Sequence, residues 1–142
     1  MKPGSWAIST VIHAEADAAA TFTNMPAADT FLFSSSRHIQ MIDLSGMSHV
    51  RLKVNKQATA GASGAKLTLK FSPTFSTTVG NYSNIGTSSV EVAINVTNTY
   101  LDSGWVELVP EATSGDVYLA VIGSGGDGVL DPTFGTISVA FV

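Results

Sequence analysis

Alternation of apolar and polar residues constrains the fold of this chain more than any other feature of its sequence. Between residues 49 and 56, Val50, Leu52 and Val54 alternate with polar side chains, and residues 65–71 repeat the pattern. Because successive side chains of a strand point to opposite faces, a period of two predicts strands with one buried face. Small, flexible residues separate the two segments, so we expect them to form a hairpin.

Further segments of the same kind are separated by Gly, Ser, Asn, Asp or Pro. They cover residues 6–13, 30–33, 39–44, 90–96, 105–109, 116–122 and 134–142. Short strands at intervals of about ten residues are typical of sandwiches and barrels. We therefore predict an all-β fold, a two-sheet antiparallel β-sandwich that is jelly-roll-like and has about eight strands. Residues 14–20 have a helix-forming composition, and a short helix is the alternative there.

The length of the chain, 142 residues, leaves room for one domain, which we assign to residues 1–142. Charged residues make up only 13%, and seven Lys and Arg against eleven Asp and Glu give a net charge of -4. A nucleic-acid-binding protein needs a basic stripe to neutralise phosphates, so nucleic acid is not an expected partner. Without cysteine, neither a disulfide framework nor a thiolate metal site is expected.

Membrane and secretion signals are also not found in the sequence. No segment approaches 18 uninterrupted apolar residues, and the first residues lack a basic region followed by a long apolar run. We therefore expect no membrane partner, and we expect the protein to be made in the cytoplasm.

Residues suited to catalysis or metal binding are few and scattered. The three histidines, His13, His38 and His49, lie in separate segments without a nucleophile-elbow sequence or zinc-ligand spacing. A glycosidase needs two carboxylates that face each other across a groove, and the sequence does not place Glu107 and Asp116 on one face. We therefore predict that the protein is not an enzyme and has no cofactor, no metal and no catalytic residue.

The Gly-rich segment at residues 123–132 allows two interpretations. Its acids, Asp127 and Asp131, could offer oxygens to calcium, but the segment lacks acids at alternate positions and a closing Glu. The favoured interpretation is that its glycines supply positive φ angles for a wide hairpin that joins residues 116–122 to residues 134–142.

Three aromatic residues, Tyr82, Tyr100 and Trp105, are candidates for stacking against a ligand. Residues 72–89 predict a long surface loop, in which Phe75 and Tyr82 either fold back over the end of the sandwich or stack on a ligand. Folding back is the favoured alternative for these two. For Trp105, packing in the core or at its rim is the alternative to stacking.

The C-terminal part of the chain resembles a known class of proteins. The segments that carry this resemblance are HVRLKV at residues 49–54, GWVELVP at 104–110, DVYLAVIG at 116–123, GGDG at 125–128 and PTFG at 132–135. Over residues 44–142 the chain is similar to small all-β virion proteins of tailed bacteriophages, which serve as head decoration, cement or fibre components. No catalytic residue is carried over from such proteins.

The resemblance implies a non-catalytic structural protein of the virion. The expected role is a capsid decoration or cement protein that binds capsid or other virion proteins as a homo-oligomer, with a trimer favoured. Residues 1–11 are then expected to be an attachment arm that adds a strand to the sheet edge of a neighbour, with Trp6 and Ile8 in the protein interface.

The same motifs also recur in jelly-roll carbohydrate-binding modules. The alternative function is therefore a carbohydrate-binding or receptor-binding β-sandwich module of a phage tail or fibre. In that case Tyr82, Tyr100 or Trp105 is the stacking platform, because sugar sites combine an exposed aromatic ring with convergent polar groups.

Overall fold

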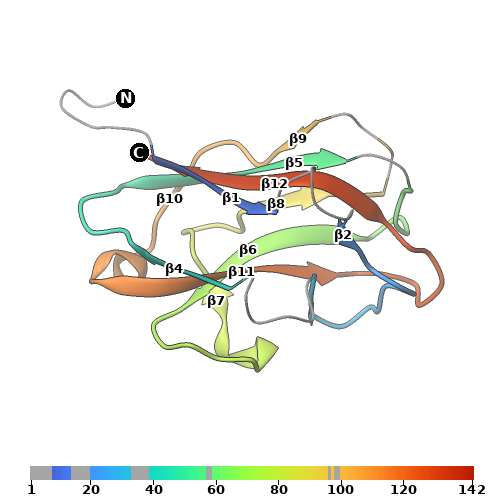
Figure 1. The fold of residues 1–142 in the computed structure, drawn as a ribbon, viewed down its shortest axis with the longest axis horizontal. Helices are drawn as coiled ribbons and strands as arrows, with labels where there is room; N and C mark the ends of the chain where they lie inside the picture. The colour runs from blue at the N-terminus through green and yellow to red at the C-terminus, as the bar shows by residue number, and fades with distance from the viewer. Residues whose placement is uncertain (1–7, 14–19, 33–38, 57–58, 96, 98–99) are drawn as a thin grey trace.

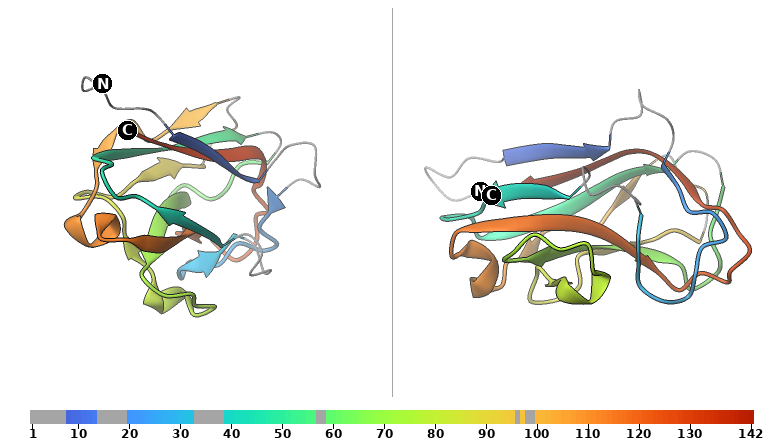
Figure 2. Two further views of the ribbon diagram at one scale, coloured as in Figure 1. Left: turned by 60° about the vertical axis from the view of Figure 1, so that its left-hand side comes forward. Right: turned by 60° about the horizontal axis from the view of Figure 1, so that its bottom comes forward.

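The computed structural model describes residues 8–13, 20–32, 39–56, 59–95, 97 and 100–142. These residues form two antiparallel sheets that pack face to face as a sandwich (Figures 1 and 2). The only helical turns in these ranges are two short 3-10 turns, Val79–Asn81 and Pro110–Thr113. No helix in the described part of the chain is long and apolar enough to cross a membrane.

The first sheet has the strand order β1-β12-β5-β10, and the second has the order β3-β11-β6-β7. The strands of the first sheet are β1 (Ile8–His13), β12 (Thr133–Phe141), β5 (His49–Lys56) and β10 (Val106–Glu107), with β2 (Ala20–Thr21) beside β12 and β9 (Leu101–Asp102) beside β5. Those of the second sheet are β3 (Thr30–Phe31), β11 (Asp116–Ser124), β6 (Lys66–Ser72) and β7 (Ser83–Asn84), with β4 (Gln40–Asp43) beside β11 and β8 (Glu91–Ala93) beside β6.

Several of these strands are two halves of one broken strand. In the first sheet, β1 and β2 both pair with β12, and β9 and β10 both pair with β5. In the second sheet, β3 and β4 both pair with β11, and β7 and β8 both pair with β6. If each such pair is counted once, the twelve strands become eight, and the chain passes from sheet to sheet in the order of a jelly roll. The predicted jelly-roll-like sandwich of about eight strands is therefore confirmed.

Both predicted hairpins are wrong. Residues 49–56 form β5 in the first sheet, whereas residues 66–72 form β6 in the second sheet. In the same way β11 belongs to the second sheet and β12 to the first. Alternation identifies the buried face of a strand but not its partner, and the Gly-rich connections here carry the chain from one sheet to the other. The helix considered for residues 14–20 falls almost wholly outside the described residues, and Ala20 begins β2.

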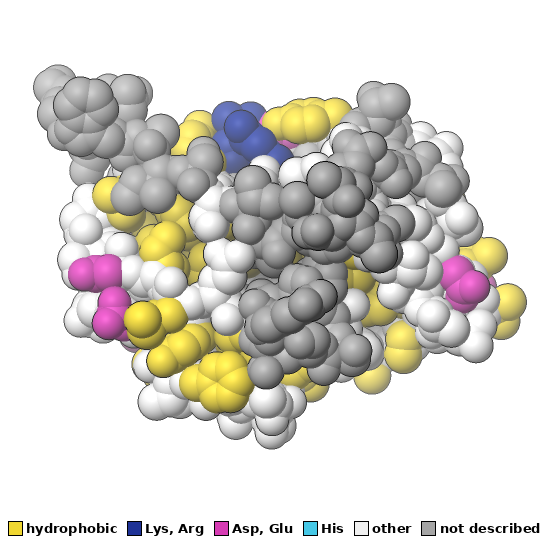
Figure 3. Space-filling model, viewed as in Figure 1, with side chains coloured by type: hydrophobic (Ala, Val, Ile, Leu, Met, Phe, Trp, Pro, Cys, Tyr) yellow, Lys and Arg dark blue, Asp and Glu magenta, His cyan; other side chains and the backbone are white. Residues whose placement is uncertain are grey.

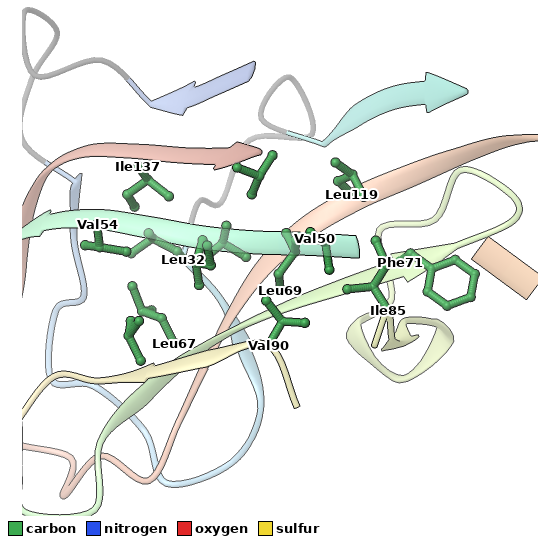
Figure 4. Packing of buried hydrophobic residues seen from close by; sticks show 14 of the residues in the cluster. Leu32, Val50, Val54, Leu67, Leu69, Phe71, Ile85, Val90, Leu119 and Ile137 are labelled. Carbon is green, nitrogen blue, oxygen red and sulfur yellow. The ribbon is translucent and has the colours of Figure 1, made fainter. Parts of the chain in front are cut away.

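The core lies between the two sheets. From β5, Val50, Leu52 and Val54 are completely buried, and they belong to the same cluster as Leu67 and Leu69 of β6 (Figure 4). The polar residues that alternate with them on β5 remain partly exposed. The face that the alternation predicted to be buried is therefore confirmed for both strands.

Candidate functional site

An ion pair links β5 to the short strand β9 on the outer face of the first sheet. Arg51 of β5 donates hydrogen bonds from Nε and from a terminal nitrogen to the two carboxylate oxygens of Asp102 in β9, with 3.0 Å between Nε and Oδ1. Such a two-point contact holds both groups in one geometry more firmly than a single ion pair does. The carboxylate also accepts a hydrogen bond from the backbone N–H of Gly104 at 2.8 Å.

Two exposed aromatic side chains contact this ion pair. The Arg51 guanidinium lies 5.3 Å from the centre of the Trp105 ring, within range of a cation–π interaction. The Tyr100 hydroxyl donates to Oδ2 of Asp102 at 3.2 Å. Trp105 is 43% exposed and Tyr100 is 54% exposed. We call these four residues the aromatic site.

The surface around the aromatic site mixes charge, polar groups and apolar groups. In Figure 3 a basic, an acidic and an apolar group lie together along the upper edge of the molecule, over β5 and β9. A hollow of about 250 Å³ adjoins Tyr100. Its lining is formed by Lys53, Val54, Asn55, Tyr100, Thr136 and Ser138. An exposed ring beside hydroxyl, amide and ammonium groups can bind a ligand that has one apolar face and several polar groups.

The hydrogen bonds from Arg51 hold the pKa of Asp102 at about 2, below its ordinary value of 3.8. The unfolded chain therefore binds more protons than the folded protein between these two values, and stability rises with pH across this window. The stabilisation is fully present above pH 4 and is lost as the pH falls through 2.

We therefore expect Asp102→Asn to lower the free energy of unfolding by about 1–2 kcal/mol at pH 7, since solvent screens part of the interaction. The variant should also lose much of the decline in stability between pH 4 and pH 2. Urea denaturation at several pH values measures both effects, with Asp116→Asn, at the exposed start of β11, as the control. Parallel pH curves for the native protein and Asp102→Asn would contradict the assignment.

Tyr82 does not belong to the aromatic site. It lies on the outer side of the second sheet and is only 5% exposed. Its hydroxyl donates to the carbonyl oxygen of Ser76 at 2.8 Å, and its ring meets Phe31 edge to face at 5.5 Å. Tyr82 as a stacking platform is therefore wrong, because neither face of a buried ring is open to a ligand. Tyr82 instead packs against the outer side of the second sheet, whereas Phe75, which was expected to fold back with it over the end of the sandwich, is 52% exposed.

The outer side of the second sheet carries a second apolar cluster. Tyr118, Ala120 and Ile122 of β11 pack there with Tyr82, and apolar side chains from neighbouring segments cover them. This cluster was not predicted, because β11 was expected to be half-buried. The uninterrupted apolar run from residue 117 to residue 122 was the available signal, since strands that are covered on both faces show such runs.

Two exposed side chains extend this cluster toward solvent. Met41 pairs with Tyr118 across β4 and β11, and Phe75 meets the Tyr118 ring edge to face at 5.8 Å. Met41 is 60% exposed and Phe75 is 52% exposed. We call Met41, Phe75 and Tyr118 the apolar face. Figure 3 shows apolar side chains gathered in this region, over β4 and β11 at the lower left.

Residues 8–11 of the expected attachment arm pair with another strand of the same chain. These residues lie in β1, the edge strand of the protein's own first sheet, where Ile8 is opposite Phe141 and Val11 is opposite Ser138. The strand pairs within the chain because β12 offers it a long free edge. Trp6, the other predicted interface residue, lies outside the described residues.

The two acids of residues 123–132 bind backbone groups. Oδ1 of Asp127 accepts hydrogen bonds from the N–H groups of Val129 and Leu130, which lower its pKa. Oδ1 of Asp131 accepts one from the N–H of Asn24 at 2.6 Å. Both carboxylates therefore stabilise this loop and its contact with the preceding segments.

The structure describes two of the three histidines, His13 and His49, and they lie in different strands. The imidazole Nδ1 of His49 lies 2.8 Å from the Ser48 hydroxyl. His13 lies in β1, and His38 is outside the described residues. Within the described ranges, no three His, Cys, Asp or Glu side chains form a group that could hold a metal ion.

The fold and these surfaces define the chain as a jelly-roll β-sandwich with an aromatic site on one sheet and an apolar face on the other. Comparison with known protein families, curated proteins and solved structures finds no match. The function is therefore inferred from the residues and their geometry.

Proposed function

We propose that this protein is a non-catalytic structural protein of a bacteriophage virion that binds capsid proteins as a homo-oligomer, as decoration and cement proteins do. The observation that carries the proposal is the apolar face. Met41 and Phe75 are large and exposed, Phe75 contacts the Tyr118 ring, and Met41 is opposite Tyr118 in the sheet. Protein interfaces are enriched in Met and aromatic residues and depleted of charge.

Two further properties support this role. The jelly roll is a frequent architecture of viral capsid proteins. The low content of charged residues, 13%, suits a surface that packs against other subunits. Binding through a sheet face also requires no catalytic group.

Light scattering and binding to empty phage heads test this proposal. The native chain is expected to be an oligomer, with a trimer favoured, and to bind the heads. The double variant Met41→Ser, Phe75→Ser should remain folded because both side chains are exposed. It should bind heads at least tenfold more weakly or lose its oligomeric state.

Val129→Ser is the matched control, because Val129 is exposed at the tip of the loop after β11 and does not belong to the apolar face. This variant should assemble and bind as the native chain does. A native monomer that ignores phage heads would overturn the proposal, as would a double variant that binds them normally.

The aromatic site favours a second candidate function, a carbohydrate-binding module. Tyr100 and Trp105 are both exposed and share the Arg51 and Asp102 pair, so aromatic and polar groups converge as a sugar site requires. Single Tyr100→Ala and Trp105→Ala variants are expected to weaken binding to host-surface polysaccharide at least tenfold. The control is Phe75→Ala, because Phe75 is an exposed aromatic residue in the segment after β6, away from the aromatic site. Undiminished binding by both variants would exclude this function.

A further inference from the structure

A second hollow opens on the outer face of the second sheet, at the opposite end of β11 from the apolar face. Its volume is about 180 Å³. Its lining is formed by Asp29, Lys66, Thr68, Lys70, Asn84, Ser89, Ile122 and Ser124. We call this hollow the polar pocket. It shares no residue with the aromatic site.

The floor of the polar pocket contains a buried hydroxyl group. Thr68 of β6 and Ile122 of β11 are opposite each other in the sheet, and Thr68 is only 6% exposed. The Thr68 hydroxyl makes no hydrogen bond with any residue in the described part of the chain. A buried polar group without a partner costs free energy, and a bound ligand or water removes that cost.

The walls of the pocket carry charges that are already paired. Nζ of Lys70 lies 3.2 Å from a carboxylate oxygen of Asp29, and Nζ of Lys66 lies 3.2 Å from one of Glu91. Each lysine is therefore held in place and neutralised by a neighbouring acid. The pocket offers donors and acceptors without a net positive charge, which favours a neutral polar ligand over an anion.

The size of the pocket limits the ligand to one small ring. Pockets for drug-sized molecules have volumes of roughly 300–1,000 Å³, and this pocket is smaller. Hydroxyl groups of a sugar can both donate and accept, so they match a lining of lysine, carboxylate, amide and hydroxyl groups. Ile122 supplies the apolar part of the floor, against which the C–H groups of a ring can pack.

We propose that the polar pocket binds a single neutral sugar ring, with the Thr68 hydroxyl as a direct hydrogen-bond partner. This inference does not depend on the proposed virion role. It also concerns a different sheet from the aromatic site, so the two sites can be tested separately.

Titration with monosaccharides, followed by amide NMR shifts, tests the proposal. The probes are glucose, galactose, mannose and N-acetylglucosamine, with inorganic phosphate as the anionic probe. At least one neutral sugar is expected to shift the amides around Thr68 and Asn84. Thr68→Val keeps the shape of the side chain and removes the hydroxyl, and it should weaken that binding at least tenfold.

The matched control is Thr77→Val, because Thr77 is exposed and lies outside the pocket. This variant should bind the sugar as the native chain does. Thermal unfolding of both variants shows whether each remains folded. The proposal is overturned if no neutral sugar shifts these amides, if phosphate alone does so, or if the shifts cluster around Tyr100 and Trp105. Equal affinity in Thr68→Val would exclude the hydroxyl as a partner.

Discussion

Replacement of Phe134 by alanine is expected to lower the free energy of unfolding by about 3–5 kcal/mol. The Phe134 side chain is completely buried and meets the ring of Phe22 edge to face at 6.5 Å. It also lies where β12 pairs with both β2 and β5 and where the register with β5 shifts. Loss of the ring therefore leaves a cavity at a junction of three strands. Domains of this kind are stable by about 5–15 kcal/mol, so the loss is a large fraction of the total.

Urea denaturation of the native chain and of Phe134→Ala measures this effect. Phe75→Ala is the control, because it removes the same side chain from an exposed position. It should cost less than about 1 kcal/mol. A change below about 1 kcal/mol for Phe134→Ala would show that the ring is not part of the core.

Gly125→Ala is expected to have the second largest effect. It should lower the free energy of unfolding by about 3 kcal/mol, because backbone strain and steric overlap act together. Gly125 has a φ of +76°, a conformation that L residues rarely adopt. A Cβ at this position would also lie far closer than 3.0 Å to the carbonyl oxygen of Gly64. Because the position of a Cβ is fixed by the backbone and its neighbour is a main-chain atom, the overlap cannot be relieved by turning a side chain.

Gly128→Ala separates the two contributions. Gly128 has nearly the same φ, +79°, but a Cβ there would meet nothing within 4 Å. Only backbone strain should therefore lower the free energy of unfolding of this variant, by about 1–2 kcal/mol. Chemical denaturation of both variants gives the comparison. If the two losses are equal, close approach to Gly64 makes no contribution.

The strand segments with one buried face, and with them the sandwich class, follow from the local sequence pattern. Val50, Leu52 and Val54 alternate with polar residues, and this pattern is local, since it depends only on the period of the strand. The same pattern predicted which side of β5 and β6 enters the core. It failed for β11, where an apolar outer side is covered by segments that are distant in sequence.

The pairing of the strands and the contacts between distant side chains could not be predicted from the sequence. The strands of both predicted hairpins separate into different sheets, because pairing depends on where each connection carries the chain. Tyr100 and Trp105 meet at the pair of Arg51 and Asp102, which are 51 residues apart in sequence, whereas Tyr82 lies on the opposite sheet. These contacts are long-range, and no local pattern encodes the register that creates them.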